Sequence, residues 1–230
     1  MTTRSEFLAA GVAAAAIPPV AAASSTPPPT AKPSMPPLHF DVGAFDAVLN
    51  VPAAHKHLFT SAKINGGLIL DNARSTLAAY SDIGVSFKDV QPAIVFYHFS
   101  TCLGYNDTVW NDYLLKVKPP NPKSLTDFQK DFNSVYDGTS RGNPCLHKTG
   151  KEGDVSIESL VADANARFFV CNNATTYIAG FVAKALKLEP VGVYTKMAAN
   201  LVPNAMLVPA GVWGIHAVQE RHYTYLQATL

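Results

Sequence analysis

The sequence predicts an α/β fold in which a parallel β-sheet carries helices on both faces. Strand-like and helix-like segments alternate from residue 55 to the end of the chain, and this alternation is typical of parallel sheets with right-handed crossovers. Two segments, residues 93–98 and 166–171, are too continuously apolar for half-exposed strands. Hydrophobic residues make up 48% of the chain and charged residues 15%, which indicates one core over residues 55–230 and favours self-association.

Residues 1–23 have the features of an export signal. Arg4 gives a weakly positive start, an apolar alanine-rich segment follows, and alanines 21–23 offer a cleavage site before Ser24. The segment is too short, and too interrupted by proline, to span a membrane. Residues 4–8 look like a twin-arginine leader with Ser5 in place of the second arginine, so the export route stays open. We expect a periplasmic or secreted protein; the alternative is a disordered tail on a cytosolic one.

Residues 24–54 form a proline-rich linker and a lead-in to the domain. Prolines recur among Ser, Thr and Ala up to residue 37, and this composition favours an extended tether over a packed core. Apolar side chains return at residues 39–54. We expect that part to form a short segment that covers the domain.

The first half of the domain contains two strands and two helices in this interpretation. Gly66-Gly67 marks the turn before the first helix, and Gln91-Pro92 introduces the second strand. The expected elements are a strand at 58–62, a helix at 68–80, a strand at 93–98, a loop at 99–107, and a helix that Asp107 or Thr108 caps and that runs to 115.

Residues 116–155 interrupt this pattern. The segment contains several prolines, an Asp-Gly pair and scattered charges, and we expect one short helix near residues 125–135. A connection of this length is usually a functional loop, a lid or an oligomer contact.

Regular alternation returns in the second half of the domain. Helical pattern resumes at residues 156–161, whereas residues 191–199 are ambiguous. Val212, Ile215 and Val218 are expected on the buried side of the last helix. The other expected elements are strands at 166–171, 205–209 and 223–226 and helices at 177–186 and 211–221.

The strand at residues 166–171 ends in Cys171, followed by Asn172, Asn173 and a helix. In open α/β sheets, ligands and reactions lie at the carboxyl ends of the strands, and a helix N-terminus stabilises a nearby thiolate. A nucleophilic Cys171 is therefore one interpretation. The other is an inert packed residue, which cysteines that close apolar strands frequently are.

Several other chemistries are not expected. The net charge is +1 without a block of like charges, so the chain lacks the basic stripe that nucleic-acid binding requires. No glycine-rich phosphate loop is present, and we predict no flavin, nucleotide or other cofactor. His55 and His57 are spaced to bind a metal on one strand face, but no third ligand lies nearby. Cys145 and His147 are also ligand-type residues, and they too lack further ligands nearby. We predict a solvated histidine pair and no metal site.

The most specific motifs lie in the last third of the chain. Residues 217–226 contain Gln219-Glu220-Arg221-His222-Tyr223, and residues 95–99 end in His98-Phe99. The other matching segments are Asn72-Ala73-Arg74-Ser75 with Leu77, Phe168-Phe169-Val170-Cys171 and Met206-Leu207-Val208-Pro209-Ala210-Gly211-Val212. Together, over residues 55–226, these segments resemble the DsrE/DsrF-like family, especially its exported members, with His222 and Phe99 standing where that family has glycine.

The resemblance implies a flavodoxin-like sheet of about five parallel strands and assembly into a homo-oligomer, a trimer or a hexamer. It also implies that Cys171 accepts sulfane sulfur as a persulfide from a donor and passes it to an acceptor protein. His98 lies at the end of the neighbouring strand, where it is placed to stabilise the thiolate. The chain departs from the family at Asn172, where a glycine often follows the cysteine, in a missing arginine-glycine pair and in the extra residues 116–155.

A second function stays open, in which an oligomer presents the sheet edge to a small ligand or partner without catalysis. The candidate ligand-binding residues are Cys102, Asn172 and Asn173. Cys102 and Cys145 both lie in expected loops. They therefore either form a disulfide that leaves Cys171 free, or Cys102 is a packed thiol.

Overall fold

The computed structural model describes residues 35–117, 127–132, 141–147 and 155–227. These residues belong to one compact unit, Pro33–Leu230. The expected export signal at residues 1–23, most of the proline-rich linker and most of residues 116–155 lie outside the described residues.

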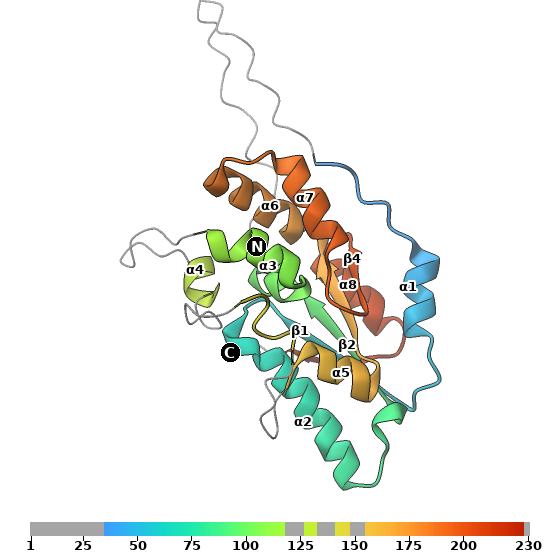
Figure 1. The fold of residues 1–230 in the computed structure, drawn as a ribbon. Helices are drawn as coiled ribbons and strands as arrows, with labels where there is room; N and C mark the ends of the chain where they lie inside the picture. The colour runs from blue at the N-terminus through green and yellow to red at the C-terminus, as the bar shows by residue number, and fades with distance from the viewer. Residues whose placement is uncertain (1–34, 118–126, 133–140, 148–154, 228–230) are drawn as a thin grey trace, which may run out of the picture. The chain divides into compact units, whose positions relative to one another are not determined.

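Five parallel strands form one sheet with the order β4-β3-β2-β1-β5 (Figure 1). This result confirms the α/β class and fits a flavodoxin-like fold. The strand beyond β1 is the last in the chain, whereas the flavodoxin order 2-1-3-4-5 has the second strand there. The strands are β1 (His55–Ser61), β2 (Val90–Phe96), β3 (Arg167–Cys171), β4 (Ala205–Val208) and β5 (Thr224–Gln227).

Helices connect the strands and cover both faces of the sheet. The described α-helices are α1 (Val42–Leu49), α2 (Leu68–Asp82), α3 (Asp107–Asp112), α4 (Asp127–Phe132), α5 (Ile157–Ala164), α6 (Asn172–Leu186), α7 (Pro190–Ala199) and α8 (Gly211–Gln219). Four 3-10 segments are η1 (Asn65–Gly67), η2 (Phe87–Asp89), η3 (His98–Gly104) and η4 (Leu114–Lys116).

The order of the strands decides which face each helix covers. The connections from β1 through β2 and β3 to β4 all step in one direction, so right-handed crossovers place α2, α5 and α6 on the same face. The connection from β4 to β5 runs back past β1, and α8 therefore covers the opposite face together with α1 (Figure 1). Consequently α6 and α8 leave the neighbouring strands β3 and β4 toward opposite faces.

Alternating side chains of the strands fill two cores. Phe168 and Val170 of β3 join the larger core with α2, α5, α6 and α7, whereas Phe169 faces the smaller core with α1 and α8. Phe45 and Leu49 of α1 are fully buried in the smaller core. The covering segment expected at residues 39–54 is therefore confirmed, and the packed part of the domain begins before residue 55.

Some expected elements differ from the observed ones. The expected loop at residues 99–107 is largely the buried η3, and the ambiguous residues 191–199 belong to α7. Helix α6 begins at Asn172 because Cys171 caps it. Val212 was expected to be buried but is 58% exposed. It lies in the first turn of α8, and Gly214, Ala217 and Val218 supply the buried face of that helix instead.

Residues 141–147, one of the described parts of the insertion, pack onto the domain. Asn143 is buried; its Nδ2 donates to the carbonyl oxygens of Leu103 and Tyr105 at 2.9 and 2.7 Å, and its Oδ1 accepts from the Cys145 N–H at 2.9 Å. Buried amides satisfied in this way hold a segment in one conformation. Through the hydrogen bonds of Asn143, this part of the insertion therefore holds the C-terminal end of η3 in place.

Candidate functional site

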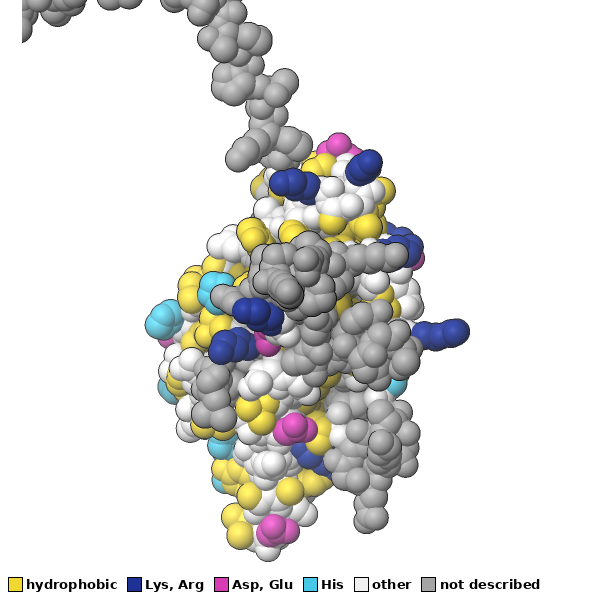
Figure 2. Space-filling model, turned by 90° about the vertical axis from the view of Figure 1, so that its left-hand side faces the viewer, with side chains coloured by type: hydrophobic (Ala, Val, Ile, Leu, Met, Phe, Trp, Pro, Cys, Tyr) yellow, Lys and Arg dark blue, Asp and Glu magenta, His cyan; other side chains and the backbone are white. Residues whose placement is uncertain are grey.

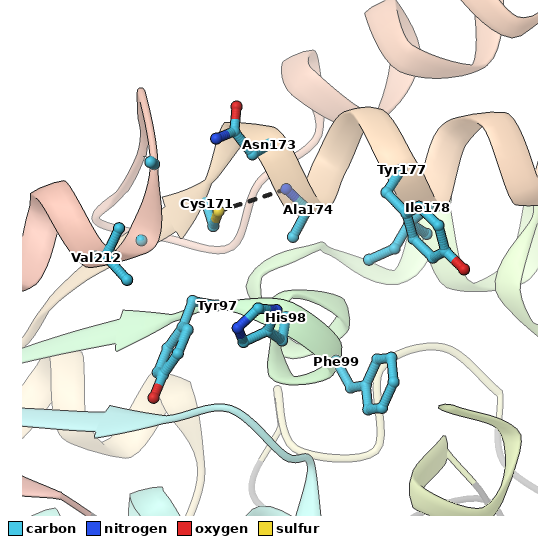
Figure 3. Close-up of a pocket in the computed structure, with 11 residues that line it drawn as sticks. Tyr97, His98, Phe99, Cys171, Asn173, Ala174, Tyr177, Ile178 and Val212 are labelled. Atoms are coloured by element: carbon cyan, nitrogen blue, oxygen red, sulfur yellow. Dashed lines mark hydrogen bonds between the residues drawn. The ribbon is translucent and has the colours of Figure 1, made fainter. Parts of the chain in front are cut away.

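A pocket of about 380 Å³ opens at the carboxyl ends of β2, β3 and β4. Figure 3 shows Tyr97, His98 and Phe99 along one side and α6 along the other, with Cys171 and Val212 at one end. The pocket lies where α6 and α8 diverge from neighbouring strands, the position at which open α/β sheets bind ligands. Its lining residues are Tyr97, His98, Phe99, Cys171, Asn173, Ala174, Tyr177, Ile178, Ala210, Gly211 and Val212.

Cys171 is both the last residue of β3 and the N-cap of α6. Its Sγ accepts a hydrogen bond from the Ala174 N–H at 3.4 Å. Its carbonyl accepts from Thr175 Oγ1 at 2.9 Å, and that hydroxyl in turn accepts from Tyr105 at 2.7 Å. These contacts hold the sulfur at the N-terminus of α6, where a backbone N–H group stabilises negative charge. Cys171 is 6% exposed, and its exposed part faces the pocket.

Close packing around Gly211 holds the start of α8 against Tyr97 and Cys171. A Cβ placed on Gly211 would lie 2.3 Å from the Cβ of Tyr97 and 3.3 Å from that of Cys171. Only glycine lets the start of α8 approach β2 and β3 this closely. Helix α8 can therefore lie this close to Cys171 because residue 211 has no Cβ.

The segment after β2 turns sharply into η3. His98 has a φ of 51°, a left-handed conformation that is uncommon for residues other than glycine. The Ser100 hydroxyl holds the turn: it accepts from the Tyr97 N–H at 3.0 Å and donates to the Ser61 carbonyl at 2.5 Å. His98 is exposed beside the pocket, and its ring centroid lies 5.0 Å from that of Tyr97.

The structure brings together three of the five predicted site residues. Cys171, His98 and Asn173 all line the pocket. Asn172 does not line it, because its Oδ1 accepts a hydrogen bond from Tyr194 of α7 at 2.7 Å. Cys102 is fully buried in the larger core, away from the pocket lining, and burial raises its pKa. The expectation that Cys102 and Asn172 share the site is therefore wrong.

All three cysteines are free thiols in the structure, and the alternative of a disulfide between Cys102 and Cys145 is not realised. Cys145 is 8% exposed and lies close to Gly67, where an added Cβ would be 3.0 Å from its Sγ. Burial raises the pKa of Cys145 to about 12. Cys102 and Cys145 thus behave as packed residues.

Sequence reasoning did not select most of the apolar lining. Tyr177 and Ile178 reach the pocket from α6, and Ala210 and Gly211 reach it from the start of α8. The Pro209-Ala210-Gly211 stretch after a short strand was a usable signal, because small residues there permit close approach of a helix. Tyr177 carried no local signal, since its position depends on the direction of α6.

The expectation of a solvated histidine pair is wrong, because His55 and His57 of β1 are half-buried and pack against other side chains. His57 lies between Tyr80, whose hydroxyl is 2.9 Å from Nε2, and Thr224, whose hydroxyl is 2.6 Å from Nδ1. The ring centroid of His55 is 4.4 Å from that of Tyr80. Burial, with a smaller effect of His55, lowers the pKa of His57. Within the described ranges, no cluster of three metal-ligating side chains occurs.

Basic side chains of the described residues form no continuous stripe on the face seen in Figure 2. On the face seen in Figure 2, Lys and Arg side chains lie among acidic and uncharged ones. Among the helices that the structure describes, none is long and apolar enough to cross a membrane.

Comparison with known proteins leaves the chain without an assigned family. No family model matches the sequence, and no curated protein matches it. A search of solved structures finds similarity to a protein of unknown function from Methanobacterium thermoautotrophicum. That similarity has a TM-score of 0.36 and 12% sequence identity, over 75% of this chain and 98% of the other.

Proposed function

We propose that this chain is an exported DsrE-like protein that accepts and relays sulfane sulfur as a persulfide on Cys171. The observation that carries the proposal is the position of the Cys171 sulfur. It caps α6, accepts the Ala174 N–H at 3.4 Å and faces an open pocket. A relay thiol needs access and a stabilised thiolate more than an elaborate catalytic site.

The transfer step is a thiol exchange without net oxidation. The Cys171 thiolate attacks the outer sulfur of a donor persulfide R–S–SH, the donor S–S bond breaks, and R–S⁻ leaves as Cys171–S–SH forms. An acceptor thiolate then attacks the outer sulfur in the same way and releases the Cys171 thiolate. In the relay, His98, which lines the same pocket, and the Ala174 N–H at the start of α6 stabilise the negative charge on the sulfur.

Homo-oligomers, trimers or hexamers, are part of the same proposal. Charged residues are only 15% of the chain, and the edge strand β5 is exposed along its whole length, with Tyr225 at 43% and Leu226 at 47%. An open apolar edge strand is an unfavourable surface for a monomer. Light scattering of the purified chain measures the assembly directly, and a monomer at working concentration would contradict it.

The experiment is incubation of the folded protein with inorganic polysulfide, followed by mass spectrometry of its peptides. We expect one added sulfur atom on Cys171 and none on the buried Cys102 and Cys145. The matched variants are Cys171→Ser, which should stay unmodified, and Cys145→Ser, which should react as the native chain does. Modification absent from Cys171, or confined to Cys102, would refute the relay.

A non-catalytic binding module is the second candidate, favoured by the apolar lining of the pocket and by Tyr177, which is 69% exposed at its rim. In that case Cys171→Ser would leave cellular function intact. Substitutions in the described 141–147 segment would abolish it if this segment carries the partner surface. Localisation in the periplasm or outside the cell is tested by fractionation of cells that express the full chain.

A further inference from the structure

We propose that the sulfur donor for Cys171 is an organic persulfide with an uncharged, apolar alkyl or aryl group. This inference rests on the proposed relay function and specifies its substrate class. The apolar group would lie between Phe99 and the side chains of Tyr177 and Ile178, with the reacting sulfur beside Cys171.

The shape of the pocket supports this assignment. Figure 3 shows Cys171 and Val212 at one end and Phe99, Tyr177 and Ile178 toward the other, with His98 between. A donor that presents its outer sulfur to Cys171 must therefore extend its organic group along α6. Its neighbours there are two aromatic rings and an isoleucine, which bind apolar groups by contact and exclusion of water.

The charge of the pocket supports it independently. None of the eleven residues that the structure places around the pocket is Asp, Glu, Lys or Arg. Burial raises the pKa of Tyr97, so its phenol stays uncharged at neutral pH. A donor with ammonium and carboxylate groups would lose hydration on entry and would find no acidic side chain among these residues to pair with its ammonium group. The pocket thus discriminates against zwitterionic donors.

The rim of the pocket offers apolar surface that only an apolar ligand would cover. Tyr177 is 69% exposed and Val212 is 58% exposed, on opposite sides of Cys171. Large exposed apolar side chains gathered around a concave site usually mark a binding surface. An apolar donor that extends along α6 would remove the Tyr177 side chain from water as it reaches the sulfur.

The test compares three donors: benzyl persulfide, cysteine persulfide and inorganic polysulfide. The rate of sulfur addition to Cys171 is measured by quenched mass spectrometry and divided by the rate for N-acetylcysteine in solution, which removes the intrinsic reactivity of each donor. We expect benzyl persulfide to exceed cysteine persulfide by at least about tenfold, the effect of a small apolar contact in a pocket.

A variant separates binding in the pocket from general reactivity. Tyr177→Ser should lower the ratio of the benzyl persulfide rate to the polysulfide rate severalfold. Ile83→Ser, at an equally exposed residue beyond the end of α2, should change neither rate, and circular dichroism checks that both variants stay folded.

The outcomes distinguish the two proposals. Equal normalised rates for benzyl and cysteine persulfide, with normal polysulfide transfer, would overturn the substrate class and leave the relay standing. Absence of transfer from all three donors would overturn both. If Tyr177→Ser slowed all donors equally, the donor assignment would be wrong. If it changed the oligomeric state, a second copy of the chain would be the occupant of this surface, and the donor assignment would again be wrong.

Discussion

Gly211 of α8 packs directly on Tyr97 at the end of β2, so closely that a Cβ on the glycine would lie 2.3 Å from the tyrosine Cβ. The same Cβ would be 3.3 Å from the Cβ of Cys171. The contact joins the start of α8 to the residue that follows β2, and both line the pocket that Cys171 faces. The geometry of the pocket is therefore sensitive to the size of one residue.

Gly211→Ala should destabilise the domain by about 1–3 kcal/mol, because backbone-level overlap forces α8 away from β2. The displacement should also change the rate at which Cys171 reacts. Chemical denaturation measures the first effect and thiol titration the second. Gly180→Ala is the control: the space around Gly180 is open, and alanine in a helix interior should stabilise by about 0.5–1 kcal/mol. Equal effects of the two substitutions would contradict the packing argument.

Replacement of Cys171 should separate its capping role from its chemistry. A serine Oγ accepts the Ala174 N–H as a good N-cap, so Cys171→Ser should keep the stability of the native protein. Cys171→Ala leaves that N–H without its cap and should cost about 0.5–2 kcal/mol. Both variants should lose sulfur transfer. The thermal midpoint of each variant checks this order, and equal midpoints for serine and alanine would show that the cap contributes nothing.

Cys171 should be the thiol that iodoacetamide modifies in the folded protein near neutral pH. Cys145 is about as exposed, at 8% against 6%, but burial raises its pKa to about 12, which leaves almost no thiolate. Burial also raises the pKa of Cys102. Both should react only after unfolding in denaturant. Peptide mapping after timed alkylation shows the order in which the three thiols react, and early labelling of Cys145 would contradict the prediction.

His147 should make the domain more stable in mildly acidic solution than in alkaline solution. Its Nε2 lies 2.7 Å from Asp107 Oδ2 and its Nδ1 lies 3.0 Å from Glu158 Oε1; these hydrogen bonds, that to Asp107 first, raise the pKa of His147. A pKa raised by folding gives stability that is complete below about pH 6.5 and is lost as the pH rises through the folded value.

His147→Gln should therefore lower the thermal midpoint more at about pH 5.5 than at about pH 8. Because the three side chains are partly exposed, the loss should stay below about 1 kcal/mol. His216→Gln, at an exposed histidine of α8, is the matched control for the loss of an imidazole side chain. A difference in thermal midpoint that stays constant across the pH range would show that the hydrogen bonds of His147 to Asp107 and Glu158 add no pH-dependent stability.

His222 has a φ of 66° at the turn before β5, in the left-handed region that favours glycine. His222→Gly should stabilise the domain by about 0.5–1 kcal/mol, because glycine adopts the left-handed conformation without a Cβ clash. His216→Gly, within α8, should instead cost about 1 kcal/mol. Denaturation midpoints of both variants give the comparison, and destabilisation by His222→Gly would indicate that its side chain makes a compensating contact.

The sequence by itself determined the α/β class, the five strands and the position of Cys171 at a strand end, because these follow from local apolar runs and the turns between them. It also placed His98 at the end of the neighbouring strand. It did not determine that Cys102 and Asn172 lie away from the pocket, since the burial of Cys102 and the Asn172–Tyr194 hydrogen bond depend on contacts between distant segments.

Only the tertiary structure decided what surrounds the sulfur. The pocket exists because β4 returns to β5 across the opposite face, so that α6 and α8 diverge above β3 and β4. That return brings Gly211 and Val212 to Cys171 across about forty residues of sequence. A local pattern records which side chains are apolar, but the direction of a crossover depends on the packing of the whole sheet.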